Sequence, residues 1–575
     1  MREDILLAGV LHPLLALLES RCGHSEAVRQ EVARTLTNLA FGDLVIQAEL
    51  EAKGAVRALV PLLGPLQSDM THELAAQCLS IFTASSDASR SVIMMSEGGL
   101  TYLVALMGPQ SCAAVKERSA QILMHISINA ANKASIVAAG AIPALVSLLG
   151  PVNSLQTQFE AMRAMRQLAA SDFIVMVKIT EAGIIPRLVS FLTSSTSVDG
   201  INLMVKEAAA ALLVDITNNS KIGCRAKVVT AGVIPPLIRL LGSQDPVSLQ
   251  ENAARMLLNI INDSSTSLSK AVAAGALPAL VSLLKARDGA GFSGLQATAA
   301  KALEIVISHS PDHYEAAVAA GVIAPLVALL KEGGSSIVHE QAARALICLT
   351  SDAQNKASIV EAGGLQALVQ LLKPSGAMAV QEHAAWLLRR LAAGNDGSIT
   401  SSIVALGFIP LLVTLLEFKA DTTSSAGSKL RGAAAAAALH SLAVSAPMSI
   451  PQIISAGAIP LLVSLLDSNN SHEAHEHAAG TLKKIALNSK GRSMAAATGA
   501  IPPLVELISN DHPEAVQEHA AGALWSLAFD SESKLKIKAA GGVSSLACLA
   551  KSTRSHRVQA NAAGALDILN SRNKW

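Results

Sequence analysis

Aromatic residues are scarce in this sequence. Only 2% of the 575 residues are Phe, Trp or Tyr, although 51% are apolar. A core of this composition must be built from Ala, Leu, Val and Ile, and Ala and Leu rank highest in helix propensity. The composition therefore indicates closely packed helices and an all-α fold.

The chain also lacks a strong net charge. Its 45 Lys and Arg residues nearly balance 44 Asp and Glu residues, for a formal charge of +1. This balance argues against a nucleic-acid-coating protein or an acidic tail. The C-terminal end is locally basic, however, with Lys534, Lys536, Lys538, Arg554 and Arg557. If the chain meets a membrane, we expect either an indirect contact or one through this basic end.

Cysteine motifs and targeting segments are missing as well. The six cysteines lie far apart and form no Cys-x-x-Cys pair, which is typical of reduced, mostly buried thiols. The opening stretch MREDILLAGV has no signal-peptide pattern and no Met-Gly start for myristoylation. We therefore expect a cytoplasmic protein, a nuclear protein, or both.

Catalytic motifs are absent apart from one weak match. The stretch GAGFSG at 289–294 fits G-x-G-x-x-G, but this fingerprint binds dinucleotides only after a strand and at the start of a helix. Here it follows the apolar segment ALVSLLK, so a flexible connector is expected. We predict no catalytic activity, no cofactor and no small-molecule substrate.

Several histidines gather in SHEAHEHAAG, at His472, His475 and His477. His477 occupies the same repeat position as His383 and His519, which is typical of a repeat consensus rather than a ligand. A metal site needs converging ligands and supporting groups around them. No metal site is predicted.

An uncharged run of twenty residues, 397–416, meets the length criterion for a membrane span. It contains Gly407 and Pro410, and the same glycine-proline spacing recurs in segments that charged residues flank closely. The run is therefore predicted to be a buried helix pair interrupted by a turn.

A glycine recurs every 42–50 residues, usually after a small residue and before an apolar pair. Thirteen copies identify a repeat array extending over 1–575 as a single solenoid. The turn glycines are Gly9, Gly54, Gly98, Gly140, Gly183, Gly232, Gly275, Gly321, Gly363, Gly407, Gly457, Gly499 and Gly541. Longer loops are expected near 194–202, 286–294 and 417–432, and their Ser- and Thr-rich sequences leave phosphorylation open.

Each repeat predicts three helices. A short helix ends at the glycine, which adopts a left-handed conformation without a Cβ penalty. A proline such as Pro143 then fits the first turn of an apolar helix. A polar loop and a longer helix such as VQEHAAGALWSLAFD, 516–530, complete the unit. In that helix Ala520, Ala521, Leu524 and Leu527 form the predicted buried stripe.

The segments GAIPPLVELI and VQEHAAGALWSLA resemble the armadillo repeat, and the resemblance covers essentially the whole chain. It implies a right-handed superhelical α-solenoid of about 13 repeats. It also implies that the third helices line a concave groove. In importin-α the positions of Gly522 and Ser526 hold a Trp and an Asn that bind a peptide. Here one Trp and two Asn occupy these positions, never in one repeat, so the sequence is more similar to β-catenin-like and plant or vacuole-type scaffolds.

Cations occupy many of the remaining groove positions, and Arg groups suit carboxylate and phosphate ligands. Arg34, Arg163 and Lys301 have no acidic residue four positions earlier, so a ligand role is expected. Whether Arg255 and Arg344 bind a ligand or pair with Glu251 and Glu340 stays open. The predicted protein-binding residues are Arg34, Asn38, Arg163, Gln167, Arg255, Asn259, Lys301, Arg344, Trp386, Arg390, Lys484, Trp525 and Ser526.

Trp386 is expected to face Arg390. Towards the C-terminus the groove positions become small, at Ala437, Gly480, Gly522 and Gly564. An open groove with Trp525 beside it would seat a partner helix, and packing of Trp525 between repeats is the alternative.

These observations predict a non-enzymatic, monomeric scaffold or adaptor for other proteins. Its partners would present extended segments, acidic or phosphorylated ones in particular, or helical segments. The alternatives are a nuclear import carrier similar to importin-α and a membrane-associated armadillo organiser. The identity of the partner, the pathway and the presence of a preceding domain are not encoded in these patterns.

Overall fold

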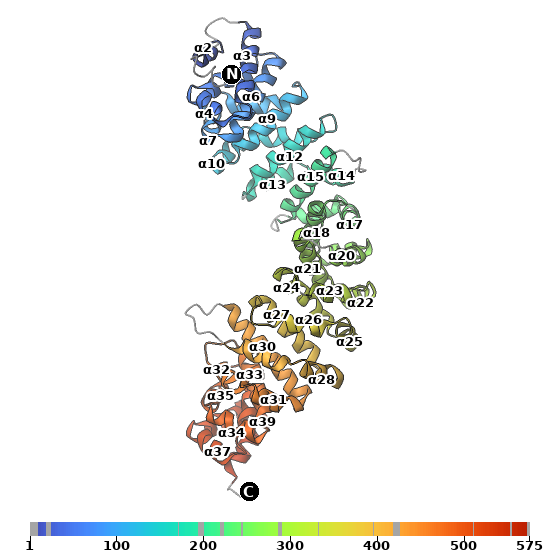
Figure 1. Cartoon of the computed structure of the whole chain (residues 1–575), viewed down its shortest axis with the longest axis vertical. Helices are drawn as coiled ribbons and strands as arrows, with labels where there is room; N and C mark the ends of the chain where they lie inside the picture. The colour runs from blue at the N-terminus through green and yellow to red at the C-terminus, as the bar shows by residue number, and fades with distance from the viewer. Residues whose placement is uncertain are drawn as a thin grey trace. The chain divides into compact units, whose positions relative to one another are not determined.

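The computed structural model describes residues 10–18, 25–170, 172–193, 200–218, 223–242, 245–285, 290–331, 333–394, 396–417, 426–509, 511–552 and 555–571. Within these ranges all regular secondary structure is helical. The chain divides into a first unit, Met1–Ala274, and a second unit, Gly275–Trp575. Figure 1 shows each unit as a series of short helices accompanied by longer ones.

In the first unit, helices recur in the predicted order of a short helix, an apolar helix and a long helix. The short helices are α4 (Leu44–Ala52), α7 (Asp87–Met95), α10 (Ala130–Ala138), α13 (Phe173–Glu181), α16 (Cys224–Thr230) and α19 (Ser265–Ala273). The apolar helices are α2 (Leu11–Ala16), α5 (Ala55–Leu59) with η2 (Val60–Leu63), α8 (Gly99–Leu106), α11 (Ala141–Leu148), α14 (Ile185–Thr193) and α17 (Ile234–Leu241). The long helices are α3 (Glu26–Ala40), α6 (Asp69–Ser85), α9 (Ala113–Ile126), α12 (Leu155–Ala169), α15 (Gly200–Asn218) and α18 (Val247–Ile261).

The second unit repeats the same order. Its short helices are α22 (Pro311–Ala319), α25 (Ala353–Glu361), α28 (Gly397–Ala405), η5 (Pro447–Ser449) with α31 (Ile450–Ser455), α34 (Ser489–Ala497) and α37 (Ser531–Ala539). Its apolar helices are α20 (Ala276–Leu284), α23 (Ile323–Leu329), α26 (Gly364–Leu371), α29 (Phe408–Leu416), α32 (Ala458–Ser464), α35 (Ile501–Leu507) and α38 (Gly542–Ser552). Its long helices are η4 (Ala290–Phe292) with α21 (Ser293–His309), α24 (Ser336–Leu349), α27 (Met378–Ala392), α30 (Ala426–Ser445), α33 (His472–Ile485), α36 (Glu514–Leu527) and α39 (His556–Asn570).

The turn glycines have the left-handed backbone conformation that the repeat pattern predicts. Twelve of the thirteen have φ between +73° and +92°, and Gly9 lies outside the described residues. At Gly140 a Cβ would meet no atom within 4 Å. Glycine is therefore favoured here by the backbone angle φ of +82° and not by a lack of space.

Consecutive long helices pack against each other within each unit, so every repeat covers the apolar face of its neighbour. The predicted stripe on α36 is confirmed, because Ala520, Ala521 and Leu524 are fully buried and Leu527 is 1% exposed. Alanine at two of these positions lets neighbouring backbones approach closely, while leucine fills the remaining volume.

A recurring polar link explains why Gln appears in both VQEH segments. Gln381 and Gln517 donate their side-chain amides to the carbonyl oxygens of Lys373 and Ser509, at 2.6 and 2.7 Å. Each acceptor lies eight residues earlier, where the apolar helix has just ended. Each carbonyl also accepts a backbone N–H, from Gly376 and His512 respectively, so the glutamine bond adds a link between the long helix and the turn before it.

The long insertions contain more helix than expected. The segments 194–199, 286–289 and 418–425 lie outside the described residues. Beyond these segments, α15 begins at Gly200, η4 at Ala290 and α30 at Ala426, so each predicted loop is shorter than its expected range. The glycine-rich stretch contributes to η4 and α21, and the segment before it is helix α20 rather than a strand, as predicted.

The uncharged run forms two helices, as expected. α28 and α29 meet at Gly407 with a bend of 72°. Among the described residues no single helix is both long and apolar enough to cross a membrane. Five bent pairs, this one included, satisfy the criteria of length and composition when their two helices are joined.

The prediction that the thiols are mostly buried is only partly correct. Among the described cysteines, Cys78 and Cys224 are buried, Cys112 and Cys348 are half-buried, and Cys548 is exposed. Cys548 lies on α38, whose main helix contacts are α37 and α39, so one side of this helix stays open.

Candidate functional site

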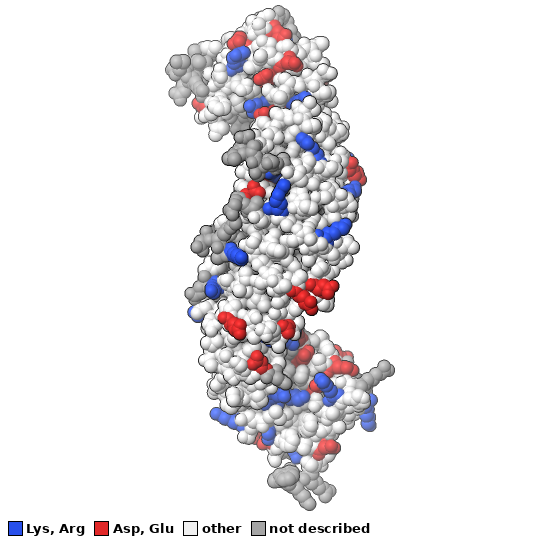
Figure 2. All heavy atoms as spheres, turned by 90° about the vertical axis from the view of Figure 1, so that its right-hand side faces the viewer, with Lys and Arg blue, Asp and Glu red and all other residues white. Residues whose placement is uncertain are grey.

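The charged side chains on the face shown in Figure 2 are scattered singly or in small groups over a mainly uncharged surface. This distribution agrees with a chain that is only 15% charged. This face therefore presents no broad field of one sign of charge.

In the first unit, the predicted groove arginines are exposed on the long helices α3, α12 and α18, but each has an acidic neighbour. Arg34 Nε lies 3.6 Å from Glu31 Oε1, and Arg255 pairs with Glu251 at 2.5 Å. The expectation that Arg34 lacks a partner is wrong, because an acidic residue three positions earlier in a helix also comes within reach. Arg255 resolves the open alternative in favour of the in-helix pair.

Arg163 on α12 was also expected to be free and is not. Its Nη1 lies 3.0 Å from the carboxylate of Glu160, whose side chain is 5% exposed, and its guanidinium lies 5.6 Å from the centre of the Phe159 ring. Burial raises the pKa of Glu160, and Arg163 opposes that rise. Arg163 therefore compensates the charge of a buried carboxylate, so its guanidinium is less available to bind a ligand.

A cavity of about 710 Å³ opens beside Arg163, between the C-terminal ends of the long helices and α13. It is partly apolar and partly polar. Its lining residues are Met124, Arg163, Arg166, Gln167, Ala169, Ala170, Asp172, Phe173, Met176, Asp215 and Asn218. Two of the predicted site residues, Arg163 and Gln167, are thus brought to one site.

The polar wall of this cavity is held by bonds between adjacent repeats. Arg166 Nε lies 2.7 Å from Asp215 Oδ2, and Asn259 Nδ2 donates to Asn218 Oδ1 at 2.8 Å. Asn259 is a predicted site residue whose amide is used to link α18 to α15. Asn38 is exposed on α3, away from the residues that line the cavity.

In the second unit, Lys301 is exposed on α21 and has no ion-pair or hydrogen-bond partner in the described part of the chain, as predicted. Arg344 has one, but it is not Glu340, the partner that the sequence left open: its guanidinium binds both carboxylate oxygens of Glu304, with the closest contact at 3.0 Å. A residue of the preceding long helix is better placed for two parallel bonds than a residue one turn away on α24.

Trp386 on α27 faces a different arginine from the one expected. The guanidinium of Arg389 lies 4.9 Å from the centre of its ring, and the ring of His477 lies 6.1 Å away at a steep angle. Arg390 turns towards α24, where it donates to the hydroxyls of Thr350 and Ser351 at 3.1 and 3.2 Å.

The small residues near the C-terminus do not open the groove, so that expectation is wrong. A Cβ on Gly480 would lie 2.7 Å from the ring of His440, and one on Gly522 would lie 2.6 Å from Cε of Lys483. A Cβ on Gly564 would lie 2.7 Å from the Trp525 ring. In each case a large side chain of the preceding long helix already occupies the space.

Two predicted site residues are therefore packing residues. Trp525 lies between α36 and α39 over Gly564, which is the alternative that the sequence left open. Ser526 is 7% exposed and donates to the carbonyl of Gly522 at 3.0 Å. Lys484 is half-buried on α33, near His440, and forms no ion pair among the described residues.

The sequence contains a pattern that indicates this packing, but the pattern links residues of two adjacent repeats. Three residues after the groove position of one repeat lies a residue whose side chain contacts the groove position of the next repeat. The two contacting residues are 39 or 40 positions apart in the sequence. The pairs are Glu304 with Arg344, His440 with Gly480, Lys483 with Gly522, and Trp525 with Gly564. Large residues thus precede small ones, and an acid precedes an arginine.

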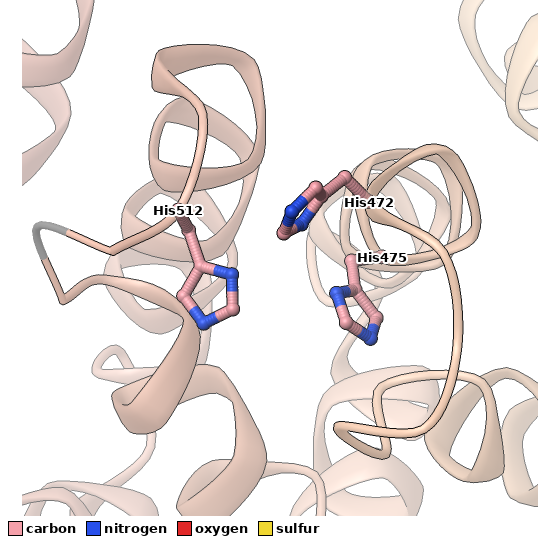
Figure 3. A group of neighbouring side chains, drawn as sticks. All are labelled: His472, His475 and His512. Carbon is pink, nitrogen blue, oxygen red and sulfur yellow. The ribbon is translucent and has the colours of Figure 1, made fainter.

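The sequence also missed how the histidines are arranged. His477 is buried near His440 and Trp386, which agrees with a packing role. His472 and His475 instead lie close to His512 of the next repeat, and Figure 3 shows the three rings turned towards a common space.

Comparisons with known proteins agree with the geometry. A family model described as "Armadillo/beta-catenin-like repeat" matches residues 129–170, 222–261, 352–393, 447–487 and 488–529. The crystal structure of an engineered protein from the Northeast Structural Genomics Consortium is 32% identical, with a TM-score of 0.62, and the match covers 75% of this chain and 99% of that chain. The repeated helix triplets, the glycine turns and these matches show an all-α solenoid. The chain belongs to the armadillo-repeat family.

Proposed function

We propose that this chain is a non-enzymatic scaffold that binds an extended segment of another protein on the long helices of its first unit. Armadillo solenoids are typically protein-binding scaffolds. The observation that carries the proposal is the cavity of about 710 Å³ next to α12.

The lining of the cavity suits a polypeptide. Met124, Met176 and Phe173 offer apolar surface, and Phe173 is 41% exposed. Gln167 and Asn218 offer amide groups at the rim. An extended segment presents alternating side chains and a regular row of backbone donors and acceptors. One side chain of such a segment fits the apolar part, and its main chain bonds the amides.

The preference for acidic or phosphorylated segments is confined to fewer residues than the sequence suggested. Arg34, Arg163 and Arg255 each serve an acidic neighbour. In the second unit, Lys301 and Lys484 have no ion pair among the described residues and Arg390 bonds only hydroxyl groups. These cations are available for an anionic ligand as a set separate from the cavity of the first unit. An arginine has five donors, and Arg390 therefore binds a phosphate oxygen without giving up both hydroxyl bonds.

Selection of peptides on the full chain tests the proposal. A library of random peptides is selected on the wild type, and the binders are measured again on Gln167→Ala/Asn218→Ala, which removes both rim amides. We expect affinity to fall about tenfold or more, because two hydrogen bonds contribute roughly 1–3 kcal/mol together.

The matched control is Lys270→Ala, on an exposed position of the short helix α19. Its affinity for the same peptides is expected to equal that of the wild type. Peptides that bind the cavity variant and the wild type equally would place the binding surface elsewhere. Repeating the selection with phosphorylated peptides on Lys301→Ala tests the preference for anions separately.

A further inference from the structure

Three histidines of two consecutive repeats meet at one point. His472 and His475 come from the first turn of α33, and His512 comes from the segment between α35 and α36. Their candidate ligand nitrogens all lie within 4.8 Å of one another. Figure 3 shows the ring of His512 across from the rings of His472 and His475.

The hydrogen bond of His475 determines which of its ring nitrogens carries a free lone pair. Its Nε2 lies 2.8 Å from the carbonyl oxygen of Asp467, eight residues earlier. Gln381 and Gln517 fill the same repeat position and donate N–H groups to the equivalent carbonyls. A carbonyl oxygen only accepts, so Nε2 of His475 carries the proton. Nδ1 is therefore an unprotonated acceptor.

That acceptor is buried and has no hydrogen-bond partner among the described residues. His475 as a whole is 1% exposed. Nδ1 of His475 and Nδ1 of His512 are both buried side-chain nitrogens without a partner. Leaving such groups unsatisfied costs free energy, and each one calls for a physical account. A repeat-consensus role explains Nε2 of His475 but not its Nδ1.

We propose that His472, His475 and His512 bind a divalent transition metal ion, of which zinc is the best fit, and that the ion clips two consecutive repeats together. Neutral imidazoles suit zinc, cobalt, nickel and copper, whereas calcium and magnesium prefer oxygen ligands. Three protein ligands leave a fourth tetrahedral position for water or for a group from a partner.

The geometry needs only a small adjustment for this role. With Zn–N bonds of about 2.0–2.1 Å, tetrahedral ligand atoms lie about 3.4 Å apart. His472 is exposed and His512 is half-buried, so both rings have room to close the gap, while His475 is held by its bond to Asp467. A ligand imidazole that donates its other N–H to a backbone carbonyl is the arrangement that orients metal-binding histidines.

The charges around the cluster favour a cation on balance. Asp511 and Glu506 lie close enough to influence the titration of His512. The N-terminus of α33 opposes a cation, and the two carboxylates offset that opposition.

Zinc titration of the full chain, stripped of metal with a chelator, tests this inference. The key variant is His475→Gln, because glutamine at this position keeps the bond to the carbonyl and removes the ligand nitrogen. We expect one zinc ion to bind the wild type at least about tenfold more tightly than it binds His475→Gln or His512→Gln. Zinc is also expected to raise the Tm of the wild type and not that of either variant.

The matched control is His339→Gln. His339 fills the same repeat position as His475, and its Nε2 lies 3.1 Å from the carbonyl of Lys331, but it belongs to no histidine cluster among the described residues. Zinc affinity equal to that of the wild type is expected. The inference is overturned if His475→Gln, with a metal-free Tm unchanged, binds zinc as tightly as the wild type and His339→Gln do. This result would leave the proposed peptide binding of the first unit untouched.

Discussion

The long helices of the first unit and those near the C-terminus carry equivalent repeat positions but use them for different purposes. On α12 the groove position is Arg163, which is exposed beside a cavity. On α33 and α36 the same position is Gly480 and Gly522, both buried beneath side chains of the preceding helix. One region presents its variable residues, and the other uses them to join repeats.

The contrast shows that the position of a residue within the repeat does not determine whether its side chain is exposed. Whether it is open depends on the residue about 40 positions earlier, which lies over it. Where that residue is His440, Lys483 or Trp525, the position holds glycine. Side chains on neighbouring helices share one volume, so the size of one restricts the size of the other.

The largest effect in this comparison is expected from the substitution Gly480→Leu. We expect it to destabilise the chain by about 3 kcal/mol, because His440 already fills the space of the new side chain. Urea unfolding followed by tryptophan fluorescence measures the loss. Lys301→Leu places the same residue at an exposed groove position and is expected to change stability by less than about 0.5 kcal/mol.

A double variant checks the cause. His440→Ala/Gly480→Leu is expected to recover a large part of the stability that Gly480→Leu loses, since removing the ring frees the volume. Equal losses in the single and double variants would mean that His440 does not determine the size of this position.

The pH dependence of stability sharpens the comparison further. Burial, with smaller contributions from His519 and His477, lowers the pKa of His440 from 6.5 to about 3. The unfolded chain therefore binds a proton between pH 6.5 and 3 that the folded chain excludes, so stability falls as the pH is lowered through this range. For His440 the expected loss between pH 7 and 5 is about 2 kcal/mol.

His440→Phe keeps a ring over Gly480 and removes this titration. Its unfolding free energy is expected to change less between pH 7 and pH 5 than that of the wild type, by about 2 kcal/mol. The exposed His556 provides the control, since His556→Phe should leave the pH dependence as it is.

Two arginine variants should give the smallest effects and separate a packed ion pair from an exposed one. Arg344→Ala leaves the carboxylate of Glu304, 17% exposed, without its two bonds, and is expected to cost about 1 kcal/mol. Arg34→Ala removes a contact at 3.6 Å between exposed side chains and is expected to cost less than about 0.5 kcal/mol. Thermal unfolding of both variants at two salt concentrations gives the comparison, and equal losses would contradict it.

Most of the fold could be predicted from the sequence because its determinants are local. The glycine of each turn needs a backbone angle that other residues rarely adopt, and the alanine and leucine stripe of α36 follows the helical period. The candidate site was predicted less well. Gln167 and Arg163 do line a cavity, but the partners of Arg163 and Arg344, at Glu160 and Glu304, were not identified.

The physical reason is the sequence separation over which a pattern of residues can be recognised. Periodicity determined the helices, their order and their buried faces, since these depend on residues within one or two turns of each other. Only the tertiary structure decided which groove positions stay open, that Arg344 pairs with Glu304 of the preceding long helix, and that His472, His475 and His512 meet. Those outcomes depend on side chains of adjacent repeats competing for the same space and the same charges.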